Sequence, residues 1–512
     1  MRSASALLPL VLLLGAAPFA SADMLMLKDG RSIEGVKIEK GDGAYTVHYK
    51  NGDVRIPEGL VRDCLVEGEG GYEPRNDEEK AKIAQGLVPF EGKWMKKAER
   101  DALVAKRLAE KKKRIEDAKA HREWRHRWMT KGTNFDFEYT IPPEIFESYK
   151  NLMETYYTVF TKKWNIQRPP KVGRLKVCFY HDYDSFLQVS GGGYGVLAYY
   201  RFMPPRELNF FYDRVAPEFT TAVMFHEANH YLTHLIDLDF DYPHCINEAF
   251  AEYYGGSKWD PVKKEMTTGG LQEGRLTEVQ TDIQGGEMRS LDKYLTDQLG
   301  YEDYTWGWSF VHFMMETPKY ASKFQKFYVG LAKGKDVERV PSQGTMRTVQ
   351  GPEILRVFKK YMGVDDIPAL EKEWYEYIKG LKLTTSRGYE EAGFAALGTG
   401  QRIKAKRFFK MAVDKGSTNP QLYERYADVL RSEDHVDEAI PLLKKGIELD
   451  PLSASLYLSL GKALRASSRD EDKTEGERML KLARELDPDN VDLEILFDEA
   501  MQKAGGPPAG GN

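Results

Sequence analysis

Residues 226–230 read His-Glu-Ala-Asn-His, and residues 247–252 read Asn-Glu-Ala-Phe-Ala-Glu. Side chains four positions apart lie on one face of an α-helix, so a helix over the first stretch would point His226 and His230 at the same metal ion. Glu248, in the second stretch, offers an oxygen as a third ligand. The two stretches therefore predict one zinc centre per chain, built by two helices that follow each other in the sequence.

Two histidines and one glutamate leave the fourth coordination position open, which is typical of a catalytic rather than a structural zinc site. Glu227 stands between the histidines, in the position of a general base. Glu252 follows Glu248 by four residues and shares its helix face, so we expect it to accept the second N–H of a ligand histidine, with Asn247 as a further supporting residue. A five-residue motif also occurs by chance, and the downstream glutamates are what favour a metal site.

Taken together, the two stretches resemble the gluzincin metallopeptidases, the clan of thermolysin and the zinc aminopeptidases. The Asn-Glu-x-Phe-Ala string at residues 247–251 is similar to the third-ligand segment of the aminopeptidase branch. The spacing of Glu248 and Glu252 is similar to that in thermolysin. The chain has no Gly-x-Met-Glu-Asn segment, so the resemblance does not extend to the amine recognition of true aminopeptidases.

The layout of residues 135–385 is closer to the secreted, peptidase-MA-like gluzincin domains. This resemblance implies a zinc-dependent peptidase that acts on a peptide or protein, with the ligands and the base already named. In related peptidases a downstream tyrosine or histidine stabilises the tetrahedral oxyanion, and Tyr304 and His312 are the candidates here. The aromatic stretch that contains them, residues 304–313, is also typical of a buried core helix.

Two strands are predicted before the first zinc helix, at residues 174–180 and 208–212. Between them lies the glycine-rich segment 191–195, which lacks the strand–helix context of a phosphate-binding loop and is interpreted as a flexible turn. In peptidases of this type an edge strand near the zinc pairs with the extended substrate. The sequence does not identify which strand forms that edge.

With 512 residues the chain is long enough for two to four domains. Its net charge of −5 argues against a bulk nucleic-acid partner. Three cysteines, Cys64, Cys178 and Cys245, make no disulfide framework, and their odd number leaves at least one unpaired in a monomer. Cys245 precedes the third ligand closely, but the predicted ligand set is complete without it, and a small buried thiol is the simpler interpretation.

Residues 1–22 have the features of a signal peptide. Arg2 precedes an apolar run at residues 6–17, and Ala20-Ser21-Ala22 fits the small-x-small cleavage pattern, with cleavage after Ala22. An uncleaved membrane anchor is the alternative, and no other segment is long enough to cross a bilayer. We therefore expect a secreted or periplasmic protein.

The chain before residue 135 divides into two segments. Residues 23–70 alternate turn signals with short strand-like runs, including a strong hairpin turn at Asn51-Gly52, and predict a small SH3-like β-barrel. Residues 75–130 form a charged, helix-like linker whose most basic patch is at residues 111–114. Acidic residues are interspersed there, so a solvated helical spacer is favoured over a nucleic-acid or membrane surface.

Residues 388–503 carry an internal repeat. An Asn-Pro or Asp-Pro pair begins at 419, 450 and 487, which is an interval of 31 (450 − 419) and then of 37 (487 − 450) residues. The pattern resembles tetratricopeptide repeats, each a helix pair that needs its neighbours for burial. The concave face of such a stack binds a peptide or protein partner; the alternative is a packing platform for the catalytic domain. Residues 504–512 are predicted to be a disordered tail.

The sequence thus predicts a multidomain α+β protein: an SH3-like β-barrel, a charged helical linker, a thermolysin-like zincin domain and a C-terminal α-solenoid. The expected function is that of a secreted zinc peptidase. Two alternatives remain, a non-catalytic envelope scaffold that works through the barrel and the repeats, and a zinc hydrolase of a non-peptide amide. The presence of Glu227 argues against the scaffold, because a decayed site is expected to lose its base.

Overall fold

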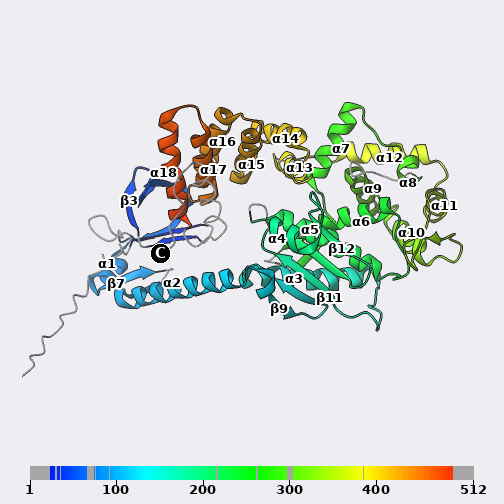
Figure 1. The fold of residues 1–512 in the computed structure, drawn as a ribbon, viewed down its shortest axis with the longest axis horizontal. Helices are drawn as coiled ribbons and strands as arrows, with labels where there is room; N and C mark the ends of the chain where they lie inside the picture. Colours follow the sequence, from blue (N-terminus) through cyan, green and yellow to red (C-terminus); the bar gives the residue numbers. More distant parts are fainter. Residues whose placement is uncertain are drawn as a thin grey trace, which may run out of the picture. The chain divides into compact units, whose positions relative to one another are not determined.

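The computed structural model is a mixed α+β fold in which helices predominate over several small sheets (Figure 1). The described residues are 23–28, 31–34, 36–65, 74, 76–90, 93–214, 217–260, 263, 265–296, 304–383 and 386–487. The predicted signal peptide and C-terminal tail lie outside them. Internal contacts divide the chain into two units, Met1–Lys112 with Leu443–Asn512, and Lys113–Leu442.

A five-stranded sheet begins the second unit, with the strand order β12-β13-β11-β10-β9. The three central strands are parallel, and each edge strand is antiparallel to its neighbour. The strands predicted at 174–180 and 208–212 are confirmed as β11 and β13, and the two edges of the sheet are β9 and β12. The bounds are β9 (Trp128–Lys131), β10 (Phe135–Tyr139), β11 (Leu175–Tyr180), β12 (Ala198–Arg201) and β13 (Glu207–Phe211).

Helices α3 (Pro143–Trp164) and α5 (Pro217–His234) pack against each other, and α5 also contacts β12 and β13. The apolar residues of α3 recur at helical spacing, so they bury one continuous face. Between the two helices, the Asn229 amide donates a hydrogen bond to the Tyr156 hydroxyl (3.2 Å). Both groups are fully buried, and the bond fixes the rotation of α5, the helix that carries the His-Glu-x-x-His motif.

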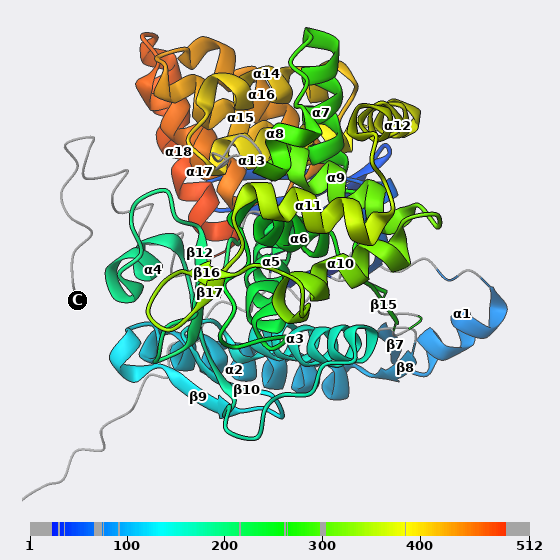
Figure 2. The same ribbon diagram turned by 90° about the vertical axis from the view of Figure 1, so that its right-hand side faces the viewer.

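The next helix, α6 (His244–Gly255), carries the second stretch of the predicted site and packs on both α5 and α9 (Tyr304–Glu316). At the crossing of α6 and α9, a Cβ on Gly307 would lie 3.0 Å from the Cβ of Ala249, so only glycine allows this approach. The remaining helices of this part, shown in Figure 2, are α4 (Tyr183–Ser190), α7 (Glu273–Gly285), α8 (Leu291–Thr296), α10 (Ala321–Lys333), α11 (Gly351–Met362) and α12 (Ile367–Gly380).

Six helices occupy the region of the predicted repeats. In the second unit α13 packs on α14, α14 on α15, and α13 also on α7. Glu391 of α13 accepts a hydrogen bond from the backbone N–H of Gly274 (3.0 Å), so the first helix pair is joined directly to the helical part that contains α7. The bounds are α13 (Arg387–Gly398), α14 (Arg402–Asp414), α15 (Pro420–Ser432), α16 (Val436–Leu449), α17 (Ala454–Ala466) and α18 (Asp470–Leu486).

The first unit contains two three-stranded sheets, β2-β1-β6 and β3-β4-β5. The predicted hairpin at Asn51-Gly52 joins β4 to β5. The predicted closed barrel is not seen over the described residues, because a short 3₁₀ turn at Glu58–Leu60 separates β5 from β6 and no ladder joins the two sheets. The bounds are β1 (Met24–Leu27), β2 (Ser32–Glu34), β3 (Lys37–Gly41), β4 (Ala44–Tyr49), β5 (Gly52–Pro57) and β6 (Val61–Leu65).

Residues of the two sheets' turns contact the segment before α17 and the helix α18 within the same unit. Arg31 makes two hydrogen bonds to the Asp450 carboxylate (2.9 and 3.2 Å), and the backbone N–H of Asn51 donates to Glu485 (3.1 Å). The predicted linker contains a short helix and a hairpin before its long helix. These elements are α1 (Asp77–Ala84), β7 (Leu87–Phe90), β8 (Lys93–Lys96) and α2 (Lys97–Ala120). Among the described residues, no helix combines the length and the apolar character that a bilayer span requires.

Candidate metal centre

The motif lies in the middle of α5, a helix that is buried on most of its surface. Its partly exposed positions include Val223, His226, Glu227 and His230, which recur at intervals of three, four and seven residues. That spacing makes one narrow stripe along the helix. The stripe carries both predicted ligand histidines and the predicted base, so the fold leaves this polar edge of the helix accessible while burying the rest.

The structure brings the three predicted ligand atoms together. The Nε2 atoms of His226 and His230 are 3.2 Å apart, and Glu248 Oε2 lies 3.2 Å from the first and 3.6 Å from the second. An ion held tetrahedrally at about 2.0–2.1 Å from each ligand requires ligand atoms about 3.3 Å apart. The donor set, two imidazole nitrogens and one carboxylate oxygen, is also one that zinc accepts. The described residues therefore fit a zinc ion in both spacing and chemistry.

Glu227 and Glu248 occupy different positions relative to the imidazoles. Glu227 also has a carboxylate oxygen within 4.8 Å of His226 and His230. Its Oε2, however, accepts a hydrogen bond from the backbone N–H of Tyr200 (2.8 Å), on the edge strand β12. Glu248 makes the direct contacts with the imidazoles and is the better ligand, and Glu227 has the position of the base.

A second set of contacts orients His226 through its other ring nitrogen, Nδ1. Glu252 Oε1 lies 3.3 Å from His226 Nδ1, and Glu252 Oε2 accepts a hydrogen bond from Arg275 Nε (2.8 Å) on α7. Burial raises the pKa of Glu252, but Arg275 and His226 outweigh burial and bring it to about 2. The ionised carboxylate thus accepts the Nδ1–H of His226 and directs its Nε2 toward Glu248 and the candidate metal position. His230 Nδ1 is buried without a hydrogen-bond partner in the described chain, so the two histidines are supported unequally.

The edge strand is attached to α5 at a second point. The Tyr200 hydroxyl donates to Nδ1 of His234 (3.0 Å), and Nε2 of His234 donates to the backbone carbonyl of Leu238 (3.0 Å). Burial lowers the pKa of His234, which keeps the ring neutral and consistent with these two roles. Tyr200 therefore holds β12 to the helix by its backbone N–H and by its side chain. No motif in the sequence indicated this contact.

Of the two oxyanion candidates, Tyr304 is the one that lies at the centre. Its ring centroid is 6.4 Å from that of His226 and 6.0 Å from that of His244. His312, two turns further along α9, is buried, and its Nδ1 accepts a hydrogen bond from the Tyr377 hydroxyl (2.9 Å). None of the contacts described for His312 involves a ligand residue, so the geometry favours Tyr304.

Two further residues differ from the sequence analysis. Asn247 makes no side-chain hydrogen bond in the described part of the chain; only its backbone N–H bonds, to the carbonyl of Pro243 (2.9 Å). His244 was not predicted, although it precedes Glu248 by the same four-residue spacing that identified the other pairs. Its Nδ1 lies 3.6 Å from Glu248 Oε1.

The charges of His226, His230 and Glu248 strongly affect one another's pKa values. Burial opposes ionisation of all three ligands, but the contacts between them outweigh it. The pKa of Glu248 falls far below its usual range beside His230 and His226. The pKa of His226 rises well above 6.5 through Glu248 and Glu252, and that of His230 also rises, beside Glu248. Without a metal ion the cluster therefore holds protons, which an incoming ion has to displace.

The comparisons with known proteins give no relative: no protein-family model matches this chain, and no curated protein is detectably similar to it.

Proposed function

We propose that this protein is a zinc-dependent peptidase of the gluzincin type, in which His226, His230 and Glu248 hold one zinc ion. The observation that carries the proposal is the triangle of ligand atoms, whose edges of 3.2, 3.2 and 3.6 Å agree with the spacing of about 3.3 Å in a tetrahedral zinc site. Three protein ligands leave a position for water or substrate, as in catalytic sites.

Zinc in such a site acts as a Lewis acid and makes water a nucleophile near neutral pH. Glu227 takes the proton of the attacking water and delivers it to the leaving amine. The hydrogen bond from Tyr200 N–H to Oε2 orients the carboxylate and leaves Oε1 for the proton. Tyr304 is proposed to donate a hydrogen bond to the oxyanion of the tetrahedral intermediate.

The position of β12 supports an extended peptide as substrate. It is an edge strand, and its backbone at Tyr200 contacts the proposed base. A peptide that added to this edge would gain main-chain hydrogen bonds and bring its scissile bond beside Glu227. We therefore favour peptide hydrolysis over hydrolysis of a non-peptide amide.

The remaining parts are assigned supporting roles. We propose export from the cytoplasm with removal of residues 1–22, and a protein partner for the repeat helices. The direct contact of α13 with α7 favours a packing role for the first helix pair, so partner binding is assigned to the helices that follow it.

The first test is the zinc content of the purified full chain, measured by elemental mass spectrometry. About one zinc per chain is expected, lost in His226→Ala and kept in the control His435→Ala, an exposed histidine just before α16. A peptide library then measures turnover, which Glu227→Gln should lower by about 10²–10⁴-fold without loss of zinc. Full activity in Glu227→Gln would refute the mechanism. A chain that takes up no zinc would favour the scaffold alternative.

A further inference from the structure

A cavity of about 290 Å³ lies in the second unit, away from the three ligand atoms. Its walls come from α7, the segment between α7 and α8, the start of α9, and the facing parts of α13 and α14. Its volume is at the lower limit of pockets that hold small molecules. Four basic and three acidic side chains line it, so its chemistry is dominated by charge.

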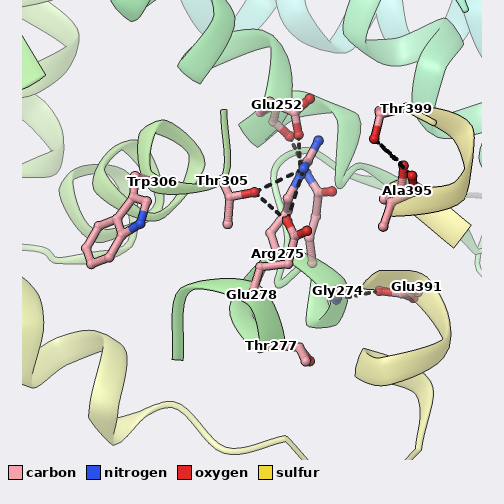
Figure 3. A network of polar contacts seen from close by, with 12 residues as sticks. Glu252, Gly274, Arg275, Thr277, Glu278, Thr305, Trp306, Glu391, Ala395 and Thr399 are labelled. Carbon is pink, nitrogen blue, oxygen red and sulfur yellow. Dashed lines mark hydrogen bonds and ion pairs between the residues drawn. The ribbon is translucent and has the colours of Figure 1, made fainter. Parts of the chain in front are cut away.

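Part of this charge is neutralised inside the wall (Figure 3). Glu278 is buried, with one oxygen 2.9 Å from Lys404 Nζ and the other 3.3 Å from Arg275 Nη1. The Thr305 hydroxyl also donates to Glu278, and Arg275 is further bonded to Glu252. These residues already satisfy one another, so they offer little to a ligand.

Three other charged groups of the cavity wall make no ion pair among the described residues. Asp282 accepts one hydrogen bond, from Trp306 Nε1 (2.9 Å), and has no ion pair within the described chain. Burial raises the pKa of Asp282, and the charges of Glu278 and Glu287 add to the effect. Glu287 and Arg407 are exposed residues of the cavity lining, and neither makes an ion pair among the described residues. The cavity thus offers uncompensated charge of both signs.

This mixture disfavours two common kinds of ligand. Neither a divalent cation nor a polyanion such as a nucleotide would meet charges of one sign only, because Asp282 and Glu287 remain beside Arg407. A small molecule with one positive and one negative group satisfies both walls with charge-assisted hydrogen bonds. Ala395, Ala396 and Phe408 add apolar surface for the rest of the molecule.

We propose that this cavity binds a small zwitterion, a free amino acid or a short unblocked peptide, with its ammonium at Asp282 and its carboxylate at Arg407. The site lies beyond the proposed peptidase centre, and its occupation does not require a metal ion. Binding and zinc content are therefore separate measurements, and either proposal can fail alone.

The probes are glycine, diglycine and triglycine, which keep both charges and vary their separation. Each is titrated by calorimetry into the full chain carrying Glu227→Gln, so that turnover contributes no heat. N-acetylated and C-amidated forms of the best probe each remove one charge. We expect one zwitterion to bind per chain. Each blocked form should bind with an affinity at least about tenfold lower than that of the zwitterion.

Two variants assign the ends. Arg407→Ala should weaken the zwitterion about tenfold but leave the C-amidated form unaffected, since that form has no carboxylate. Asp282→Asn keeps an acceptor for Trp306 and should weaken the zwitterion but not the N-acetylated form. Arg402→Ala, an exposed arginine of the same helix outside the cavity wall, is the matched control and should change nothing. No binding of any probe, equal binding of the blocked forms, or binding unchanged in Arg407→Ala and Asp282→Asn would each overturn the proposal.

Discussion

The candidate metal centre and the cavity beside α7 both gather charged side chains in the second unit, but they arrange them differently. At the metal centre, the atoms of His226, His230 and Glu248 converge to within 3.6 Å of one another. In the cavity, four basic and three acidic side chains line about 290 Å³. Convergent lone pairs suit a single ion, whereas separated charges of both signs suit a larger molecule that carries both signs.

The two regions meet at one residue. Arg275 donates from Nε to Glu252, which supports His226, and from Nη1 to Glu278 in the wall of the cavity. A substitution on one side of this guanidinium should therefore affect one region more than the other. The predictions that follow use that difference.

The largest effect is expected at the point of convergence. Glu248→Ala removes one of the three protein ligands. A structural zinc ion binds with about 10–16 kcal/mol, and dividing this energy equally over four coordination positions predicts a loss of zinc affinity of about a hundredfold or more. Competition with a chromophoric chelator measures the zinc affinity of each variant. Glu265→Ala, an exposed glutamate on β15 (Glu265–Thr267), is the control. An unchanged zinc affinity in Glu248→Ala would remove Glu248 from the ligand set.

The next effect separates the two sides of Arg275. Glu252→Gln removes the carboxylate that orients His226 and should lower zinc affinity about 10–100-fold. Glu278→Gln changes the other partner of the same guanidinium and should alter zinc affinity less than about threefold. Equal losses in both variants would mean that Arg275 joins the two regions into one site.

Zinc affinity should also depend on pH, because the raised pKa values of His226 and His230 leave protons on the metal-free cluster. As the pH falls through these raised values, protons compete more strongly and the affinity drops by about tenfold per unit for each proton displaced. Above them the affinity should level off. Chelator competition from pH 6 to 8 follows this change, and Glu252→Gln should move the plateau to lower pH. A flat profile in the native protein would contradict the coupling.

The smallest effect is expected in the cavity wall. Among the described residues, Lys404→Met leaves Glu278 with Arg275 alone as an ion-pair partner, but the Lys404 side chain is 39% exposed, so solvent screens part of the loss. We expect about 1 kcal/mol less stability in urea unfolding and no change in zinc affinity. A loss above about 3 kcal/mol would show that Glu278 depends on Lys404 as a fully buried partner.

The clustering of the candidate metal-centre residues follows from one simple rule of sequence spacing. His226, His230, Glu248 and Glu252 are related by four-residue spacings within two helices, and only the helical period is needed to bring each pair together. The spacing of His244 to Glu248 is the same, so that contact could have been found by extending the rule. The proposed chemistry itself remains a prediction from these residues.

What the sequence missed depends on contacts between elements. Arg275 is 23 residues beyond Glu252 on another helix, and no local pattern aims it at that carboxylate. The hydrogen bond from Tyr200 to Glu227 depends on which strand lies at the edge of the sheet. The two sheets at residues 24–65 have the turns of a barrel, but closure depends on pairing between sheets, which strand patterns do not specify.

The contacts of Arg31 with Asp450 and of Asn51 with Glu485 on α18 have a consequence for biosynthesis. Arg31 and Asp450 are 419 positions apart, and Asn51 and Glu485 are 434 apart. The ribosome therefore releases almost the whole chain before these surfaces can meet. Closing so long a loop adds little free energy, because the cost rises only with the logarithm of its length, but such distant contacts form slowly. Residues 23–65 are therefore synthesised early but complete their packing late. During this delay their unpacked surface is exposed, and we expect a chaperone to bind it.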